Sequence, residues 1–213
     1  MTMRSTERIL LVLAGVLAVT LGVQVTTRGP GTVHGPLLIA SWAEAPASLD
    51  ETAGSAEEVV RARVTRVRPG ADIVVNLPQE PGGEDRIPTE VVTLRVEKVY
   101  KGPAGGPPET VEVFHLGRSN GQEHIAALED PPYAQGQEYV LFLKRGPDVR
   151  VGGSSLPTRR VVSPHGRYRI QRGRMEPMSQ MGWAAQHRGR PVDQFEADVT
   201  RGIQQSAGRR PGV

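Results

Sequence analysis

The sequence contains no cysteine among its 213 residues. This absence excludes a lipoprotein attachment site, a disulfide framework and a zinc site built on thiolates. Aromatic residues are also scarce, at 4% of the chain, and the hydrophobic fraction is 38%. Because this composition is lean for a single core of roughly 185 residues, we expect a compact domain of about 100 residues with loops and tails.

Acidic residues are nearly missing from one stretch of the chain, although the net charge is only +3. Lys144–Arg174 holds nine basic residues and one acid, whereas Gly29–Leu143 holds nine basic and 17 acidic residues. The basic patch that this stretch predicts consists of Lys144, Arg145, Arg150, Arg159, Arg160, Arg167, Arg169, Arg172 and Arg174. It would suit anionic headgroups or another polyanion, but a solvated strand face gives the same pattern. Nucleic acid is not expected, because the stretch offers only Tyr168 for base stacking.

A long apolar run near the start contains no charged residue. It covers Ile9–Val25 and lies in the gap of 19 residues between Arg8 and Arg28. A helix of that length reaches about 28 Å, close to the hydrocarbon thickness of a bilayer. Arg4 and Arg8 favour a cytoplasmic N-terminus. The run therefore predicts a transmembrane helix that places the main domain outside the cytoplasm, at the cell membrane.

The cleavage signal after this run is weak. The best small-x-small pattern, Thr20–Gly22, lies inside the apolar run instead of after it. We therefore expect residues 1–28 to be an uncleaved signal-anchor. Secretion after signal cleavage is the alternative, and a buried helix of a soluble protein is a third. Residues 29–47 are predicted to form a spacer, because Thr26–Gly35 is rich in glycine and proline.

Residues 48–172 have the patterns of a mostly β domain. Apolar and polar residues alternate in Val59–Val67, which indicates a half-buried strand. The alternation in Thr89–Tyr100 slips at Glu97–Lys98, and such a slip predicts a β-bulge that bends the strand, as small barrels require. Tyr139–Leu143 is apolar on both faces, which predicts the most buried strand. The remaining strands are expected at Thr110–Leu116, Arg160–Val162 and Arg167–Gln171.

Helices and loops are predicted around these strands. Leu49–Glu58 begins as a short helix with Ser48 or Asp50 as its N-cap, and Arg68–Pro88, with four prolines and three glycines, is predicted to be a long surface loop. Residues 173–206 form a C-terminal extension ending in an amphipathic helix that packs on the barrel. The apolar stripe of this helix is Val192, Phe195, Val199 and Ile203. Residues 207–213 are expected to be a disordered tail.

Several segments of the β domain resemble netrin-like domains, the OB-type barrels of the tissue inhibitors of metalloproteinases. They are Ala56–Val64 (AEEVVRARV), Val96–Gly102 (VEKVYKG) and Tyr133–Gly136 (YAQG) followed by Tyr139–Leu143 (YVLFL). Uncharacterised membrane-attached bacterial proteins have the same line-up. The resemblance covers Ala56–Ile170 and implies a small OB-like β-barrel with a non-enzymatic binding role. The inhibitors chelate their target's zinc through a disulfide-bonded N-terminal cysteine, so that mechanism does not transfer to this cysteine-free chain.

Three methionines recur at a regular spacing in the C-terminal extension. Met175, Met178 and Met181 lie three residues apart and precede Trp183 and His187. Thioethers are soft ligands that select Cu(I), and a helix would place the three sulfurs roughly on one face. The same spacing is typical of a short hydrophobic docking segment or a linker. We favour docking or a linker, with copper binding as the alternative.

Two histidines flank the turn at Gly117–Gly121. His115 and His124, with Glu123 and Asp130, have the side chains to hold a divalent metal, but their spacing matches no metal motif such as H-E-x-x-H. Structural or solvent-exposed histidines are favoured.

One further set has the residue types of a hydrolytic triad. Ser154, Ser155, His165 and Asp148 include a nucleophile, a base and an acid, but no nucleophile-elbow sequence surrounds the serines. A turn at Gly152–Ser155 is the simpler interpretation. We therefore predict a membrane-tethered, extracytoplasmic, non-enzymatic binding module without a cofactor, whose partner is a protein or a polyanion. The alternatives are a Cu(I)-binding protein and a hydrolase.

Overall fold

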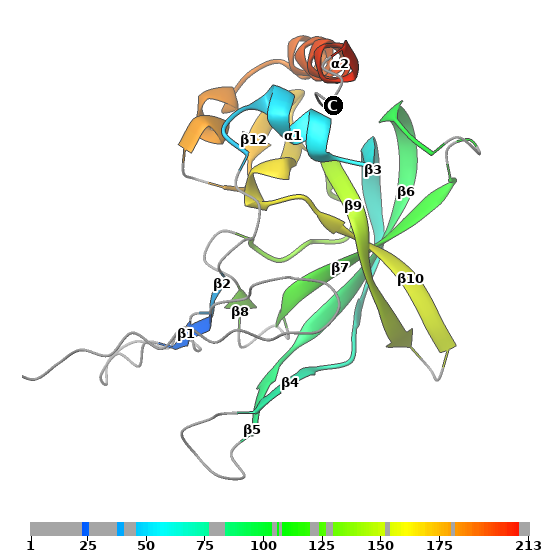
Figure 1. The fold of residues 1–213 in the computed structure, drawn as a ribbon, viewed down its shortest axis with the longest axis vertical. Helices are drawn as coiled ribbons and strands as arrows, with labels where there is room; N and C mark the ends of the chain where they lie inside the picture. The colour runs from blue at the N-terminus through cyan, green and yellow to red at the C-terminus, as the bar shows by residue number, and fades with distance from the viewer. Residues whose placement is uncertain are drawn as a thin grey trace, which may run out of the picture.

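The computed structural model describes residues 23–25, 38–40, 46–76, 84–103, 106, 108–119, 124–126, 130–151, 154–179 and 182–208. These residues are mostly β, as the sequence predicted, and Figure 1 shows a barrel with a helical layer at one pole. The barrel strands are β3 (Glu58–Pro69), β6 (Thr89–Lys101), β7 (Thr110–Ser119), β9 (Glu138–Val151) and β10 (Ser154–Val161).

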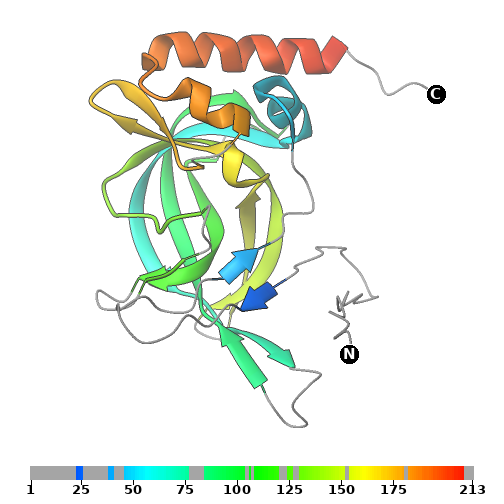
Figure 2. The same cartoon turned by 90° about the vertical axis from the view of Figure 1, so that its left-hand side faces the viewer.

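The five barrel strands form a closed ring of pairings. β3 pairs with β6 and β9, β6 with β7, and β9 with β10, all antiparallel. The parallel pair Arg159–Val113 joins β10 to β7 and closes the ring. Figure 2 shows the barrel from the side, with the long α2 across its upper pole. Closure leaves these strands with few unpaired edges.

The predicted β-bulge lies where the alternation slips. Arg61 pairs with Lys98, and Ala62 pairs with Val96, so Glu97 has no partner in β3. A second register shift lies between the pair Val59–Lys101 and the pair Val60–Val99. These shifts increase the local bend of β6, which confirms the prediction made from its sequence.

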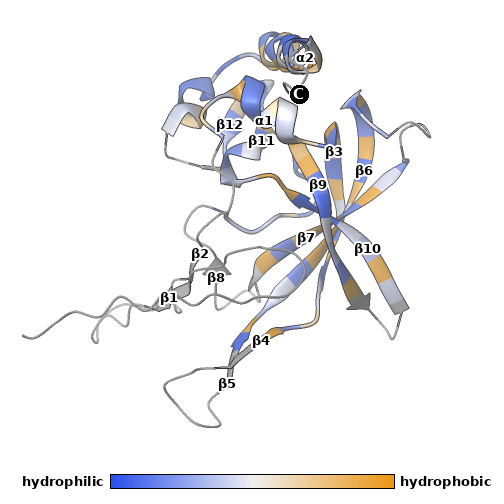
Figure 3. Ribbon diagram, viewed as in Figure 1, coloured by the Kyte–Doolittle hydropathy of each residue, from blue (hydrophilic) through white to orange (hydrophobic). Residues whose placement is uncertain are grey.

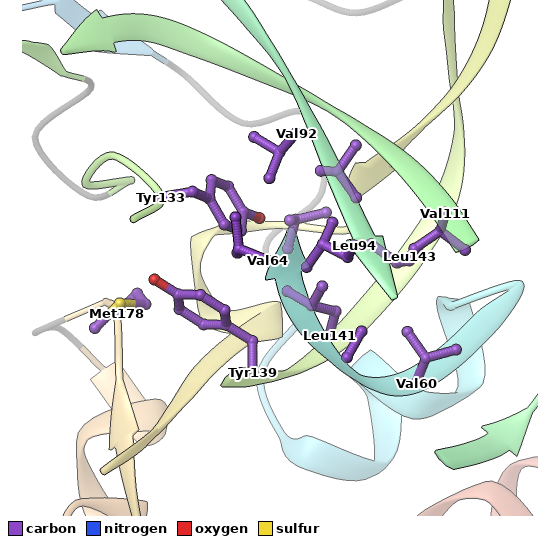
Figure 4. Close-up of a cluster of buried hydrophobic side chains, with 13 residues drawn as sticks. Val60, Val64, Val92, Leu94, Val111, Tyr133, Tyr139, Leu141, Leu143 and Met178 are labelled. Atoms are coloured by element: carbon purple, nitrogen blue, oxygen red, sulfur yellow. The ribbon is translucent and has the colours of Figure 1, made fainter. Parts of the chain in front are cut away.

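A hydrophobic cluster fills the barrel interior (Figure 4). It is built from every second residue of the strands, as the alternation predicted. Its members are Val60, Ala62, Val64, Val92, Leu94, Val111, Val113, Tyr133, Tyr139, Leu141, Leu143, Val161 and Met178. Burial of such side chains contributes about 1.5–3 kcal/mol each to folding, so this cluster is the principal source of barrel stability.

A second cluster lies between the barrel wall and the helical layer. The layer consists of α1 (Leu49–Ser55), η1 (Pro164–Gly166), η2 (Gly182–His187) and α2 (Val192–Gly208), with the hairpin β11 (Arg167–Gln171) and β12 (Arg174–Pro177). Phe142 and Val140 of β9 meet Phe195 and Val199 of α2 there. In Figure 3 the part of β9 next to the helical layer is coloured as apolar, because residues facing both clusters are apolar there. All of Tyr139–Leu143 is fully buried, as predicted.

The two helices of this layer cross closely. Ser48 caps α1 by accepting a hydrogen bond from the Glu51 backbone N–H at 3.1 Å. A Cβ atom on Gly202 of α2 would lie 2.8 Å from Asp50 Oδ1 and 3.3 Å from Asp50 Cα, so a side chain there would displace the Asp50 carboxylate and crowd the α1 backbone. Two predictions for these helices are confirmed. Ser48 caps α1, and Phe195 and Val199 of the apolar stripe on α2 are buried.

Several segments differ from the sequence predictions. The predicted loop Arg68–Pro88 contains a hairpin of β4 (Ile73–Asn76) and β5 (Glu84–Ile87), which its valines and isoleucines favour despite the prolines. Within the predicted spacer, β2 (Leu38–Ala40) pairs with β1 (Val23–Val25), the end of the predicted membrane helix. The boundary at residue 172 falls in the turn between β11 and β12.

Residues 1–22 and 26–28 of the predicted anchor lie outside the described residues, as do residues 209–213 of the predicted tail. The first two residues of that tail, 207 and 208, are the last residues of α2, so the tail prediction began too early. In the part of the chain that the structure describes, no helix is long and apolar enough to cross a membrane.

Candidate functional site

A buried polar network occupies one side of the barrel core. Arg167 of β11 has no exposed surface, and its Nη2 lies 3.1 Å from Asp130 Oδ1. The guanidinium also donates to the Pro131 carbonyl oxygen and lies over the Tyr133 ring, 4.1 Å from its centroid. Burial lowers the pKa of Arg167, but the charge of Asp130 and the contacts with Tyr133 and Tyr139 together outweigh burial and raise the pKa above its ordinary value. Arg167 is therefore a fixed cation of the interior.

His115 of β7 continues this network. Its Nε2 lies 3.1 Å from the Asp130 carbonyl oxygen and 3.5 Å from Asp130 Oδ2, and its Nδ1 lies 3.7 Å from Glu90 Oε2. The ring also meets the edge of Tyr133 at a centroid distance of 5.4 Å. We call Arg167, Asp130, His115, Glu90 and Tyr133 the interior network. Its charged groups contact one another, which is the arrangement that buried charges require.

The structure gives different outcomes for the histidine prediction and the methionine prediction. Burial of His115 agrees with a structural histidine; the side chains of Glu123 and His124 lie outside the description. Met175 is on strand β12 and packs against the helical layer, whereas Met178 packs into the barrel core. The helical face assumed for copper is therefore absent here, since Met175 is in a strand. Met181 lies outside the described residues, and among those described no three His, Asp or Glu side chains cluster as metal ligands.

The triad residues are distributed along the β9–β10 hairpin. Asp148 pairs with Pro157, and Ser155 with Arg150, in the half of the hairpin away from Val161. His165 belongs to η1, beyond Val161, and its ring contacts Trp183 at 5.7 Å. At about 3.3 Å per residue, Asp148 and His165 are separated by more than 10 Å along the strand direction. The structure does not bring them together as a triad, and the side chain of Ser154 is not described.

The predicted basic patch is divided among three places. Arg167 belongs to the interior network. Arg159 binds Glu58 at 2.6 Å on the barrel wall, and Lys144, Arg145 and Arg160 share its β9–β10 hairpin. The side chain of Arg150 is not described. The three remaining members, Arg169, Arg172 and Arg174, lie on the β11–β12 hairpin.

Three arginines that the sequence prediction did not include join this hairpin. Arg188 and Arg169 share Glu176, and Arg190 and Arg201 share Asp198. Arg174 Nη1 donates to the Gly189 carbonyl oxygen at 2.8 Å, which links the two groups. We call this set the arginine cluster; its members are Arg169, Arg172, Arg174, Arg188, Arg190 and Arg201.

Each bridging carboxylate of the arginine cluster serves two guanidiniums. Asp198 accepts from Arg190 Nη2 at 2.6 Å through Oδ2 and from Arg201 Nη1 at 3.0 Å through Oδ1. A guanidinium has five N–H donors, so most donors on both arginines remain available after these contacts. The linked set holds five arginines and two carboxylates. Arg172 adds a sixth positive charge in the turn between β11 and β12. The excess of positive charge favours the binding of anions.

A pocket of about 360 Å³ opens beside this cluster, between α1, η2 and α2. Its lining residues are Ser48, Leu49, Asp50, Gln186, His187, Arg190, Asp198, Arg201 and Gln205. His187 is 5% exposed, and neither of its ring nitrogens has a hydrogen-bond partner among the described residues. Burial, together with the charge of Arg190, lowers the pKa of His187. It is therefore a neutral imidazole in the wall of a polar pocket.

The arginines missed by sequence analysis come from segments with ordinary charge balance. Arg188 and Arg190 follow η2, and Arg201 is on α2, where Glu196 and Asp198 also occur. Only the packing of α2 beside β12 brings these residues to the hairpin. The proximity of Gly189 and Pro191 to β12 would not be apparent from spacing alone.

No family model matches the chain, and no curated protein sequence matches it.

Proposed function

We propose that this protein is a membrane-tethered, extracytoplasmic binding module that holds anionic lipid headgroups through its arginine cluster. The observation that carries the proposal is the sharing of Glu176 and Asp198 between pairs of arginines. That sharing holds the guanidiniums near one another at this pole, and on Arg190 and Arg201 a single donor each is taken up by Asp198. The remaining donors suit phosphate oxygens, because the planar fork can donate two parallel hydrogen bonds.

The strand order supports the OB-like, netrin-like part of the proposal. Numbered along the chain, the five barrel strands form the ring first, second, third, fifth, fourth, with a parallel pair between the third and fifth. This order is compatible with the five-stranded Greek-key barrel of OB-folds. OB-folds bind oligonucleotides and oligosaccharides, and a binding role is proposed here by analogy with them.

The position at which the chain enters the domain supports the membrane part of the proposal. Trp183 Nε1 donates to the Pro46 carbonyl oxygen at 2.6 Å, and Ser48 lines the pocket beside Arg190 and Arg201. The chain therefore enters the folded domain beside the arginine cluster, whereas β2 and β1, farther upstream, lie toward the other end of the barrel (Figure 2). Each positive charge near an anionic surface contributes about 1 kcal/mol, so several arginines at this pole would hold the domain against headgroups.

A vesicle-capture experiment tests the proposal with the full chain. The protein is reconstituted into phosphatidylcholine vesicles, and capture of separate phosphatidylglycerol vesicles is measured against salt. We expect capture that falls steeply with ionic strength and is lost in a triple glutamine variant of Arg172, Arg174 and Arg188. The matched control removes equal charge from exposed positions of the barrel, Arg66, Arg95 and Arg145.

Equal loss in both triple variants would contradict a role for the arginine cluster. Retention of the wild type on heparin without any vesicle capture would contradict the lipid assignment and indicate a soluble polyanion instead. The anchor has a separate test: alkaline carbonate washing should leave the full-length protein in the membrane pellet. Release with a mature N-terminus near Val23 would show that the segment is cleaved.

A further inference from the structure

The pocket between α1, η2 and α2 has a polar lining with two arginines at its edge. It is a shallow depression of about 360 Å³ that is largely open to solvent, so it suits a small, charged group. Arg190 and Arg201 reach it from opposite sides of Asp198, which holds one guanidinium on each carboxylate oxygen. This clamp orders the two side chains in advance, so a ligand does not have to fix their rotamers on binding.

His187 supplies an independent observation that points to a ligand. The ring lines the pocket, is more than nine-tenths buried, and packs against Phe195, Tyr168 and Trp183 at centroid distances of 5.3, 5.9 and 6.0 Å. Neither ring nitrogen has a partner among the described residues. Other buried polar atoms of the described residues, such as Tyr168 Oη, also have no hydrogen-bond partner, but of these residues only His187 lines this pocket. A bound ion or molecule would complete its hydrogen bonding.

We infer that this pocket binds a phosphate group, held by Arg190 and Arg201 and hydrogen-bonded to His187. The inference rests on the proposed anion binding at the arginine cluster and names the group taken up at its centre. Phosphate fits because two guanidiniums can each donate two hydrogen bonds to its oxygens. A small rotation of the His187 side chain, of the kind common at binding sites, presents one nitrogen to the ligand.

Asp50 limits the affinity of this site. Its carboxylate lines the same pocket and repels an anion, whereas Ser48, Gln186 and Gln205 offer neutral polar groups. The charged groups around His187 are therefore Asp50 from α1, Arg190 from the segment before α2, and Asp198 and Arg201 from α2. A bound phosphate would offset the positive charge of Arg190 that now lowers the pKa of His187. Binding should therefore raise that pKa.

The test follows the assigned His187 ring resonances of the full chain in non-ionic detergent. Inorganic phosphate is titrated at constant ionic strength, and glycerol 3-phosphate is titrated in parallel as a soluble headgroup analogue. We expect saturable shifts that sodium chloride does not produce, and an upward move in the pH midpoint of the His187 resonance. Arg201→Gln should weaken phosphate binding about tenfold or more, and Asp50→Asn should strengthen it.

The two probes separate the sources of the phosphate group. Tighter binding of glycerol 3-phosphate would assign the pocket to lipid headgroups, and tighter binding of inorganic phosphate would assign it to the free ion. The absence of a phosphate-specific shift, or an unchanged dissociation constant in Arg201→Gln, would overturn the inference. Arg201 is 63% exposed, so this variant should fold.

Failure of the inference can be told apart from failure of the proposed function. The triple glutamine variant of Arg172, Arg174 and Arg188 leaves the pocket lining intact, and it should lose vesicle capture while keeping its phosphate shift. Vesicle capture without any phosphate shift would refute the pocket alone. A phosphate shift without capture would refute the membrane role alone.

Discussion

The interior network and the arginine cluster use the same side chains in opposite ways. In the interior, Arg167 is fully buried and its principal partner is Asp130, which has only 7% of its side chain exposed. At the pole, Asp198 and Glu176 each divide their acceptors between two arginines that reach solvent. Removal of one partner from a buried ion pair is strongly destabilising, because the other charge stays buried without compensation. Exposed ion pairs contribute little to stability, and their arginines can also donate to a binding partner.

The largest expected effect comes from breaking the interior pair. Asp130→Ala would leave the Arg167 charge buried without its carboxylate, and we expect a loss of about 3–5 kcal/mol in the free energy of unfolding. Urea denaturation of the full chain in detergent measures this loss. The double variant Asp130→Leu with Arg167→Met should recover most of it, because well-packed apolar residues can replace a buried ion pair. Additive losses in the double variant would contradict the pairing.

The helix crossing at the pole should show the next largest effect. Gly202→Ala would place a Cβ 2.8 Å from Asp50 Oδ1 and 3.3 Å from Asp50 Cα. Such overpacking costs about 1–3 kcal/mol, measured by the same denaturation. Gly208→Ala is the matched control, because nothing lies within 4 Å of a Cβ there. Equal effects of the two substitutions would show that α1 and α2 do not cross at Gly202.

His187 gives the pole a dependence on pH. Its pKa is lowered in the folded protein by burial and by Arg190, so the unfolded chain takes up a proton at higher pH than the folded chain does. Stability should therefore fall as pH drops below about 6.5, the ordinary histidine pKa. His187→Phe removes this contribution, and its stability should fall less than that of the wild type between pH 7.5 and 5. Parallel pH profiles would contradict a buried neutral imidazole.

The smallest stability effect should come from the pole's own aspartate. Asp198→Asn weakens two partly exposed ion pairs, which we expect to cost less than about 1 kcal/mol. Capture of phosphatidylglycerol vesicles should increase, because removal of one negative charge outweighs the loss of the order that Asp198 imposes on Arg190 and Arg201. A loss as large as that of Asp130→Ala would erase the distinction between the two regions.

The sequence predicted the parts of the fold that depend on local patterns. Alternation located β3 and β6, and the slip at Glu97–Lys98 located a bulge, because a buried face imposes a period of two on each strand. A run that is apolar on both faces located β9, and the N-cap at Ser48 and the stripe on α2 were also visible as local patterns. The hairpin of β4 and β5 was missed, because prolines and glycines surround it and β5, with the sequence EDRI, has no apolar pattern of its own.

The charged sites were harder to predict because they depend on contacts between distant segments. Arg167 belonged to a run of basic residues, and nothing local distinguishes it from Arg169, whose side chain points to the other face of β11. Asp130, the residue that binds Arg167, is 37 positions earlier in the chain. The arginine cluster likewise needed α2 to be placed beside β12, and Arg201 is 27 residues beyond Arg174.

The two-faced strand β9 links the stability of the barrel to that of the helical layer. Tyr139, Leu141 and Leu143 pack into one cluster while Val140 and Phe142 pack into the other. If α2 detached, the outer face of a central strand would meet water, so opening of the helix and opening of the strand should be cooperative. Amide hydrogen exchange should therefore place α2 and β9 in one unit. Shortened versions that end before Val192 would expose an apolar surface prone to self-association.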